Sequence, residues 1–284
     1  ILNGIYGNQH RAVIDANLTP IVFEATDVLA FNKAAKTPFN VHTKIDTGLA
    51  RLGVRYTEFE AFLDVVESCS NIRIDGAMTH LAMADTDAEM TNLQLTRFEA
   101  ILERLHARGH TPTYIHAANS AATLRYPQSR YTTVRNGITM YGMGPNLEPV
   151  LSLHSQVVSV RSLPENAPVG YRDAYRTKRP SNIATIAIGY GDGYPRSLSN
   201  RGTVLVHGVP CSVVGEVSMD LTTVDVTDAP EVKPGDEVVI IGKQHNATLS
   251  AVQVAEHADI SVYELFTRLM PRLPRHYRSG LTND

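Results

Sequence analysis

The chain has 284 residues, enough for one large barrel or two ordinary domains, and its 43% apolar and 19% charged residues can build a sizeable core. A net charge of −3 argues against a nucleic-acid-binding surface, which needs a clustered basic excess. The two cysteines, Cys69 and Cys211, lack metal-ligand spacing and are typical of buried thiols in a reducing compartment. No apolar run approaches the length of a membrane span. We therefore expect a cytoplasmic protein without a metal or a membrane partner.

The first half of the chain alternates strand and helix patterns. Strand patterns lie at residues 20–23, 40–46, 72–81 and 113–116, and helix patterns lie at 26–35, at 57–67 and after a capping box at Thr86 and Glu89 that we expect to run to Gly109. This order predicts parallel strands in a (β/α)₈ TIM-type barrel, whose active site is built by the loops after the strands. We count about six of the eight units that such a barrel needs. Because residues 1–7 read as a strand and its exit loop, we expect the missing units before Ile1.

The second half is mostly β. Apolar-alternating runs separated by turns lie at 153–163, 183–188, 203–207, 211–217, 221–226 and 237–241, with a short helix near 250–257. The pattern predicts a β-sandwich or β-barrel domain. The residues from Gly144 to Asn146 are the expected junction, so the predicted domains are a partial barrel at 1–147 and a β domain at 148–284.

The run from Val134 to Gly142 stands where the two patterns meet. Arg135 follows a short β-rich run, 132–134, and Gly137 follows two residues later. One interpretation is that Arg135 and the backbone at Gly137 hold the ring and phosphate of a flat anionic cofactor. The alternative is a buried arginine paired with an acid, beside a turn glycine.

Other polar residues follow strands of the first half. Arg51 lies in a glycine-bracketed loop and could bind an anionic group bidentately, or it could form an ion pair with Asp46. His80 ends a strand, and a single histidine there is more often a satisfied core residue. Asn119 and Ser120 open a helix and could bind phosphate or simply cap it.

Three loops of the second half combine glycine with tyrosine, acid or arginine residues. They are Gly170–Tyr175, Gly189–Tyr194 and Gly215–Asp220. Each is weak evidence alone, because turns and aromatic packing explain the same composition. Together they place phenols, acids and an arginine in one class of loops.

These runs, with the stretches 44–53, 116–122, 262–264 and 272–275, resemble bacterial alanine racemases, which use pyridoxal 5′-phosphate, over essentially the whole chain. The resemblance implies a barrel plus a β domain in a head-to-tail homodimer with shared active sites. It implies racemisation of L- and D-alanine through an aldimine, with two bases on opposite faces, supplying D-alanine for peptidoglycan.

The resemblance also implies residue roles. Arg135 would face the pyridine nitrogen and keep it unprotonated, because two cations repel. Arg51 would contact the ring oxygen and the substrate carboxylate, and Tyr171 would be one of the two bases, acting from the partner subunit. His80 would bridge Tyr171 and Arg135. The remaining expected roles are cofactor binding by Asn119, Ser120, Gly137, Ile138 and Tyr263, substrate binding by Met219, Tyr190 and Asp220, and carbamylation of Lys44.

One expected residue has no match. The family's other base is the lysine that binds the cofactor, and none of the six lysines lies in its motif. We expect that lysine in a segment before Ile1; the alternative is a non-catalytic cofactor-binding or scaffold protein. A related decarboxylase is disfavoured, because no glycine-triplet phosphate loop is present and Arg135 stands where an acid would be expected.

Overall fold

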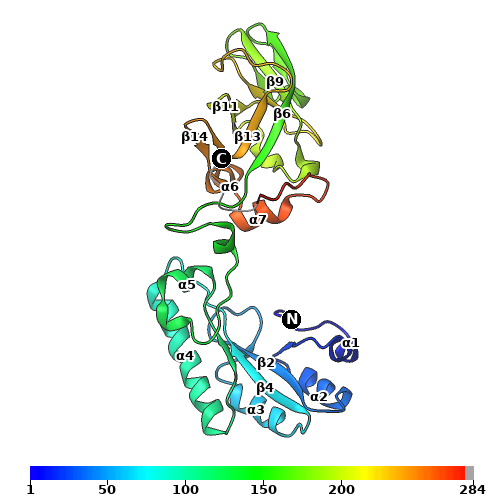
Figure 1. Cartoon of the computed structure of the whole chain (residues 1–284), viewed down its shortest axis with the longest axis vertical. Helices are drawn as coiled ribbons and strands as arrows, with labels where there is room; N and C mark the ends of the chain where they lie inside the picture. Colours follow the sequence, from blue (N-terminus) through cyan, green and yellow to red (C-terminus); the bar gives the residue numbers. More distant parts are fainter. Residues whose placement is uncertain (279–284) are drawn as a thin grey trace. The chain divides into compact units, whose positions relative to one another are not determined.

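A computed structural model describes residues 1–278. The chain divides into two compact units, Ile1–Leu147 and a second that begins at Glu148 (Figure 1). None of the helices in the described residues is both long and apolar enough to cross a bilayer.

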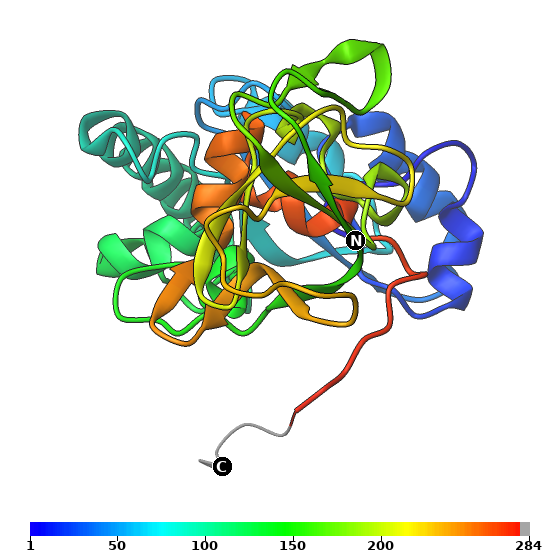
Figure 2. The same ribbon diagram turned by 90° about the horizontal axis from the view of Figure 1, so that it is seen from above.

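The first unit is a parallel sheet with helices. Its strands run in the order β1-β2-β4-β5, and β3 pairs with β2; their bounds are β1 Ile21–Val22, β2 Phe39–Asp46, β3 Val54–Arg55, β4 Ile72–Met78 and β5 Tyr114–His116. The helices are α1 His10–Asp15, α2 Ala25–Ala34, α3 Phe59–Glu67, α4 Ala88–Ala107 and α5 Ser120–Arg125. Both views place α1 and α2 on the opposite side of the unit from α4 and α5, as the strand order requires (Figures 1 and 2).

Alternation along β2 determines what it buries. Val41, Thr43 and Ile45 share one face and are all buried, as the period-two pattern predicts. On the other face Lys44 is also buried, because both faces of a parallel sheet are covered. Helix α3 buries its apolar stripe, Phe59, Phe62, Leu63 and Val66, as its 3.6-residue spacing predicts.

Three local predictions for this unit are wrong. Residues 1–7 form no strand, and neither does the run 132–134, where the amides of Thr132 and Thr133 both donate to the Ile115 carbonyl outside any ladder. Helix α4 is capped by Asp87, whose side chain accepts from the Met90 amide, so Thr86 is not the cap. The backbone at Asp87 is extended, as at most N-caps, so the short carboxylate of Asp87 reaches that amide and takes the place predicted for Thr86.

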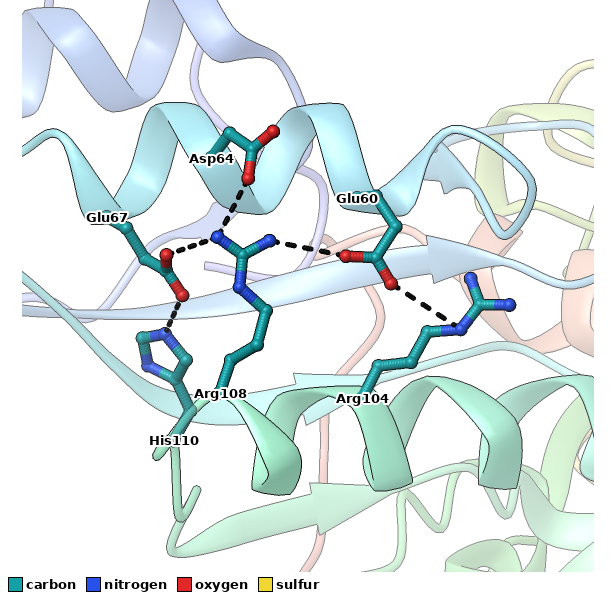
Figure 3. A network of polar contacts seen from close by, with 6 residues as sticks. All are labelled: Glu60, Asp64, Glu67, Arg104, Arg108 and His110. Atoms are coloured by element: carbon teal, nitrogen blue, oxygen red, sulfur yellow. Dashed lines mark hydrogen bonds and ion pairs between the residues drawn. The ribbon is translucent and has the colours of Figure 1, made fainter.

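Gly109 ends α4 as predicted, with the left-handed φ of +82° that glycine adopts without strain. Just before it, Arg108 joins α4 to α3. Figure 3 shows the resulting network, in which Arg108 contacts Glu60, Asp64 and Glu67, Arg104 contacts Glu60, and His110 contacts Glu67. Hydrogen bonds from Arg108 and His110 lower the pKa of Glu67. The ionised Glu67 therefore stabilises the fold slightly at pH values above the ordinary glutamate pKa. This stabilisation is lost as the pH falls through the lowered pKa of Glu67.

The second unit is a closed antiparallel barrel. Six strands pair in the ring β10-β11-β12-β9-β6-β13, and β13 pairs back to β10. The bounds are β6 Leu153–Leu163, β9 Ser181–Ile186, β10 Thr203–Val206, β11 Val209–Val213, β12 Thr222–Asp225, β13 Glu237–Gln244 and β14 Ala247–Leu249, the last paired to β13. All six ring strands overlap runs predicted from sequence, and ring closure decides for a barrel over a sandwich.

Outside the ring lie a hairpin and two helices. The hairpin joins β7 Pro168–Val169 to β8 Tyr175–Arg176. Helix α6, Ala251–Ala258, confirms the short helix predicted near 250–257 and is capped by Ser250, whereas α7, Val262–Arg268, was not predicted.

Candidate active site

The guanidinium of Arg135 lies among the carboxyl ends of β4 and β5. One nitrogen contacts Nδ1 and the carbonyl oxygen of His116, both at 2.9 Å. The other contacts the Thr79 carbonyl at 2.8 Å, the Ala117 carbonyl at 3.1 Å and Nδ1 of His80 at 3.2 Å. All five partners are neutral, so the alternative of an acid-paired arginine is wrong. Burial lowers the pKa of Arg135 to about 10, which leaves it cationic at neutral pH.

This arrangement determines which ring nitrogen carries the proton in three histidines. Because a guanidinium only donates, Nδ1 of both His80 and His116 must accept, and each ring carries its proton on Nε2. Nε2 of His116 then donates to Nδ1 of His42 at 3.0 Å, which places the proton of His42 on Nε2 as well. Burial and then the charge of Arg135 lower the pKa of His80 to about 4 and that of His116 to about 3.

A glycine makes the contact between His42 and His116 possible. His42 lies on β2 and His116 on β5, and β4 runs between them with Gly76 directly beside His42. A Cβ atom at Gly76 would lie 2.3 Å from Cγ of His42. The two imidazoles therefore meet over a strand position that only glycine leaves open.

Lys44 and Arg51 bring further positive charge to the strand ends. Burial, followed by the charges of Arg51 and Arg135, lowers the pKa of the Lys44 ammonium. The expected alternative for Arg51, an ion pair with Asp46, does not occur among the described residues. Instead Asp46 accepts from the amides of Gly48, Leu49 and Ala50 and holds the loop backbone.

Ser120 collects hydrogen-bond donors from the segment after Arg135. Its hydroxyl oxygen accepts from the Gly137 amide at 2.9 Å, from the Thr139 hydroxyl at 3.3 Å and from the Thr139 amide at 3.5 Å. Ile138 lies between them and begins a short 3₁₀ helix. Asn119 caps α5 by accepting from the Ala122 amide, as the capping interpretation expects.

The remaining predicted site residues belong to the second unit. Tyr171 is 68% exposed in the β7–β8 hairpin, and Met219 is 55% and Tyr190 44% exposed. Backbone bonds join two of these loops, since the Tyr190 amide donates to the Ser218 carbonyl and the Gly191 amide to the Met219 carbonyl. Asp220 accepts from Arg272 at 2.6 Å, and Tyr263 is exposed in the first turn of α7.

Comparison with known proteins assigns both units. The family model for the N-terminal domain of alanine racemase matches residues 1–145, and the model for its C-terminal domain matches residues 150–277. The chain belongs to the alanine racemase family.

Individual alanine racemases agree with this assignment. A curated alanine racemase from Halothermothrix orenii is 38% identical over 99% of this chain and 77% of its own length. The crystal structure of alanine racemase from Bacillus anthracis with bound L-Ala-P has a TM-score of 0.88 at 32% identity, covering 98% of this chain and 75% of that one. The structure from Bartonella henselae with covalently bound pyridoxal phosphate also has a TM-score of 0.88, at 28% identity over 98% and 78% of the two chains.

Sequence reasoning missed several residues of this racemase-like site. His42, in the middle of β2, and His116, at the end of β5, were not singled out as site residues. Thr47 was missed too; its hydroxyl bonds that of Thr79 at 2.7 Å, and Gln94 joins Thr47 to the His80 carbonyl. A sequence pattern that could have indicated such residues is the polar residue at the end of each successive strand, because parallel strands bring these residues to one edge of the sheet.

The histidine arrangement predicts an unusual titration. A free histidine protonates near pH 6.5, but His80 and His116 should stay neutral with the proton on Nε2 down to about pH 5, because their pKa values are about 4 and 3. Nitrogen-15 NMR of histidine-labelled protein would show this. Since the unfolded rings bind protons first, their contribution to stability should fall as pH drops from about 6.5 toward 4. Protonation of either ring near pH 6.5 would contradict the assigned hydrogen-bond directions.

Proposed function

We propose that the protein interconverts L-alanine and D-alanine with pyridoxal 5′-phosphate as its cofactor. The observation that carries the proposal is the partly buried Arg135, whose hydrogen-bond partners among the described residues are all neutral acceptors. A cation there can face a ring nitrogen and disfavour its protonation. Bound pyridoxal phosphate would supply an electron sink that acidifies the α-C–H bond of the amino acid.

The described residues fit that cofactor. The donors gathered on Ser120, from Gly137 and Thr139, form a small cluster of amide and hydroxyl groups suited to phosphate oxygens. Asn119 supports the cluster by capping α5 and by donating to the Leu81 carbonyl. We propose Ser120, Gly137 and Ile138, with Tyr263 from the second unit, as the phosphate-binding residues.

On the substrate side, Tyr171 of the partner subunit is the proposed base for one face of the α-carbon. The Nε2–H of His80 points away from Arg135 and is available to donate to that phenol oxygen, so it can hold the phenol in place. Arg51 binds the substrate carboxylate, and we place Met219, Tyr190 and Asp220 of the partner subunit around it. The base for the other face is the family's cofactor-binding lysine.

Lys44 is the proposed carbamylation site. Its pKa is lowered by burial and by Arg51 and Arg135, so more of the amine is neutral and nucleophilic. The amine nitrogen attacks CO₂, forms an N–C bond and releases one proton to water. The new carbamate carries a negative charge among cations, where it can orient Arg51.

We propose a homodimer that acts in the cytoplasm and supplies D-alanine for peptidoglycan. Large apolar side chains stand exposed around the second-unit loops, among them Tyr171, Met219 and Leu221, and a partner would cover them. Both cysteines are buried and unpaired, which fits a reducing compartment.

The direct test uses the naturally produced protein with pyridoxal phosphate. We expect an imine absorbance band, formation of each alanine enantiomer from the other on a chiral column, and incorporation of solvent deuterium at the α-carbon from both. Protein without the cofactor is the control. Absence of both the imine band and racemisation would favour the non-catalytic alternative, which lacks the lysine that forms the imine.

A further inference from the structure

Two loops of the second unit that carry proposed site residues are joined through one short segment. Tyr171 lies in the β7–β8 hairpin, and Met219 lies in the loop Gly215–Asp220. The segment is Ser199–Asn200, which follows the 3₁₀ helix Arg196–Leu198; Asn200 contacts both loops and Ser199 contacts the second.

Asn200 makes the connection with both ends of its amide. Its Nδ2 donates to the carbonyl of Ala174 at 2.9 Å, where the Tyr171 turn ends. Its Oδ1 accepts from the amide of Gly215 at 2.6 Å, where the Met219 loop begins. Both bonds come from a single planar group, so one amide bridges the two loops, which also meet through an ion pair between Arg172 and Glu216 at 4.0 Å.

The Tyr171 turn needs such an external contact. Gly170, Arg172 and Asp173 all have left-handed φ values, +78°, +59° and +54°. Arginine and aspartate in this region are strained, and such a turn persists only where surrounding contacts determine it. Within the turn itself the Ala174 amide donates to the Tyr171 carbonyl at 3.2 Å.

The Met219 loop has other contacts that do not involve Asn200. The Val217 amide donates to the Ser199 hydroxyl at 3.0 Å, and Glu216 pairs with Arg196 at 3.1 Å. The carbonyls of Ser218 and Met219 accept from Tyr190 and Gly191. Loss of the Asn200 amide should therefore release the Tyr171 turn more than the Met219 loop.

We propose that Asn200 is a positioning residue, which holds the Tyr171 turn against the Gly215 loop and so sets the place of the phenol. The proposal rests on the role given to Tyr171 under the proposed function. Asn200 itself touches neither the substrate nor the cofactor.

Residue type supports the assignment. Asn200 has a left-handed φ of +55°, which asparagine tolerates better than most residues. The two contacts need one donor and one acceptor. Aspartate would keep the acceptor for Gly215 and lose the donor to Ala174, while glycine would keep the backbone conformation and lose both.

The test compares Asn200→Asp and Asn200→Gly in the naturally produced holoenzyme. Asn166→Gly is the matched control, because Asn166 is exposed, has a left-handed φ of +63°, lies just before the same hairpin, and its side chain has no hydrogen bond among the described residues. The first readout is amide hydrogen exchange at Ala174 in protein without cofactor. The second is α-deuterium exchange from each alanine enantiomer.

We expect faster exchange at Ala174 in both Asn200 variants and unchanged exchange in Asn166→Gly. We also expect α-deuterium exchange to slow about tenfold for the enantiomer whose proton Tyr171 removes, with exchange from the other enantiomer within about twofold, because misplacing one base slows only its own proton transfer. A purely structural role would slow both faces equally.

Unchanged exchange at Ala174 in both variants would overturn the proposal, as would equal loss at both faces. These outcomes differ from failure of the proposed function, in which the unsubstituted holoenzyme would itself show no racemisation.

Discussion

Tyr171→Phe should abolish removal of the α-proton from one alanine enantiomer while leaving exchange from the other. The substitution deletes a single oxygen from a side chain that is 68% exposed, so the barrel should fold unchanged. General acid–base groups typically contribute about 10²- to 10⁴-fold, and net racemisation needs both faces, so it should fall by at least about 10²-fold. Solvent deuterium incorporation into L- and D-alanine, measured separately by mass spectrometry, provides the measurement.

Tyr175→Phe is the natural control, since Tyr175 ends the same turn and its ring packs with Val169 and Ile183 in the second unit. It should retain exchange at both faces. Equal loss of exchange from both enantiomers in Tyr171→Phe would show that the phenol is not the base for one face.

Arg135→Gln should reduce both stability and activity. This guanidinium donates five hydrogen bonds, and the side-chain amide of glutamine has only two N–H donors to replace them. Leaving partly buried acceptors unpaired should cost roughly 2–4 kcal/mol of unfolding free energy. Removing a preorganised charge opposite the cofactor ring should slow racemisation by about 10²–10³-fold. Urea unfolding and the chiral assay measure the two effects.

The same variant tests the cause of the histidine pKa values. Burial should still lower them, but without the charge of Arg135 the pKa values of His80 and His116 should move upward. Arg130→Gln is the control, because Arg130 is exposed and donates from Nε to the carbonyl of Thr123. Unchanged racemisation in Arg135→Gln, with unchanged histidine titration, would remove Arg135 from the site.

Local physics explains which parts of the fold were predictable. Period-two burial along β2 and the 3.6-residue stripe of α3 are set by side-chain direction in each element, and the structure confirms both. Helix α7 and the cap at Asp87 were missed, because a seven-residue helix has little periodicity and neighbouring polar residues compete for one cap.

The candidate site, too, was predictable from sequence only in part. The sequence by itself determined the strand–helix alternation, the strands of the second unit and the family resemblance, because these depend on residue order and on periodicity along one chain. It also placed Arg135 and Ser120 in their segments.

Only the tertiary structure decided which distant groups meet. His42 reaches His116 across an intervening strand because Gly76 has no side chain, and Arg135 has neutral acceptors instead of an acid. Closure of the second unit's ring depends on β10 pairing with β13, and Asn200 joins two loops by a single amide. Each contact joins residues far apart in sequence, and a one-dimensional pattern carries no information about such distances.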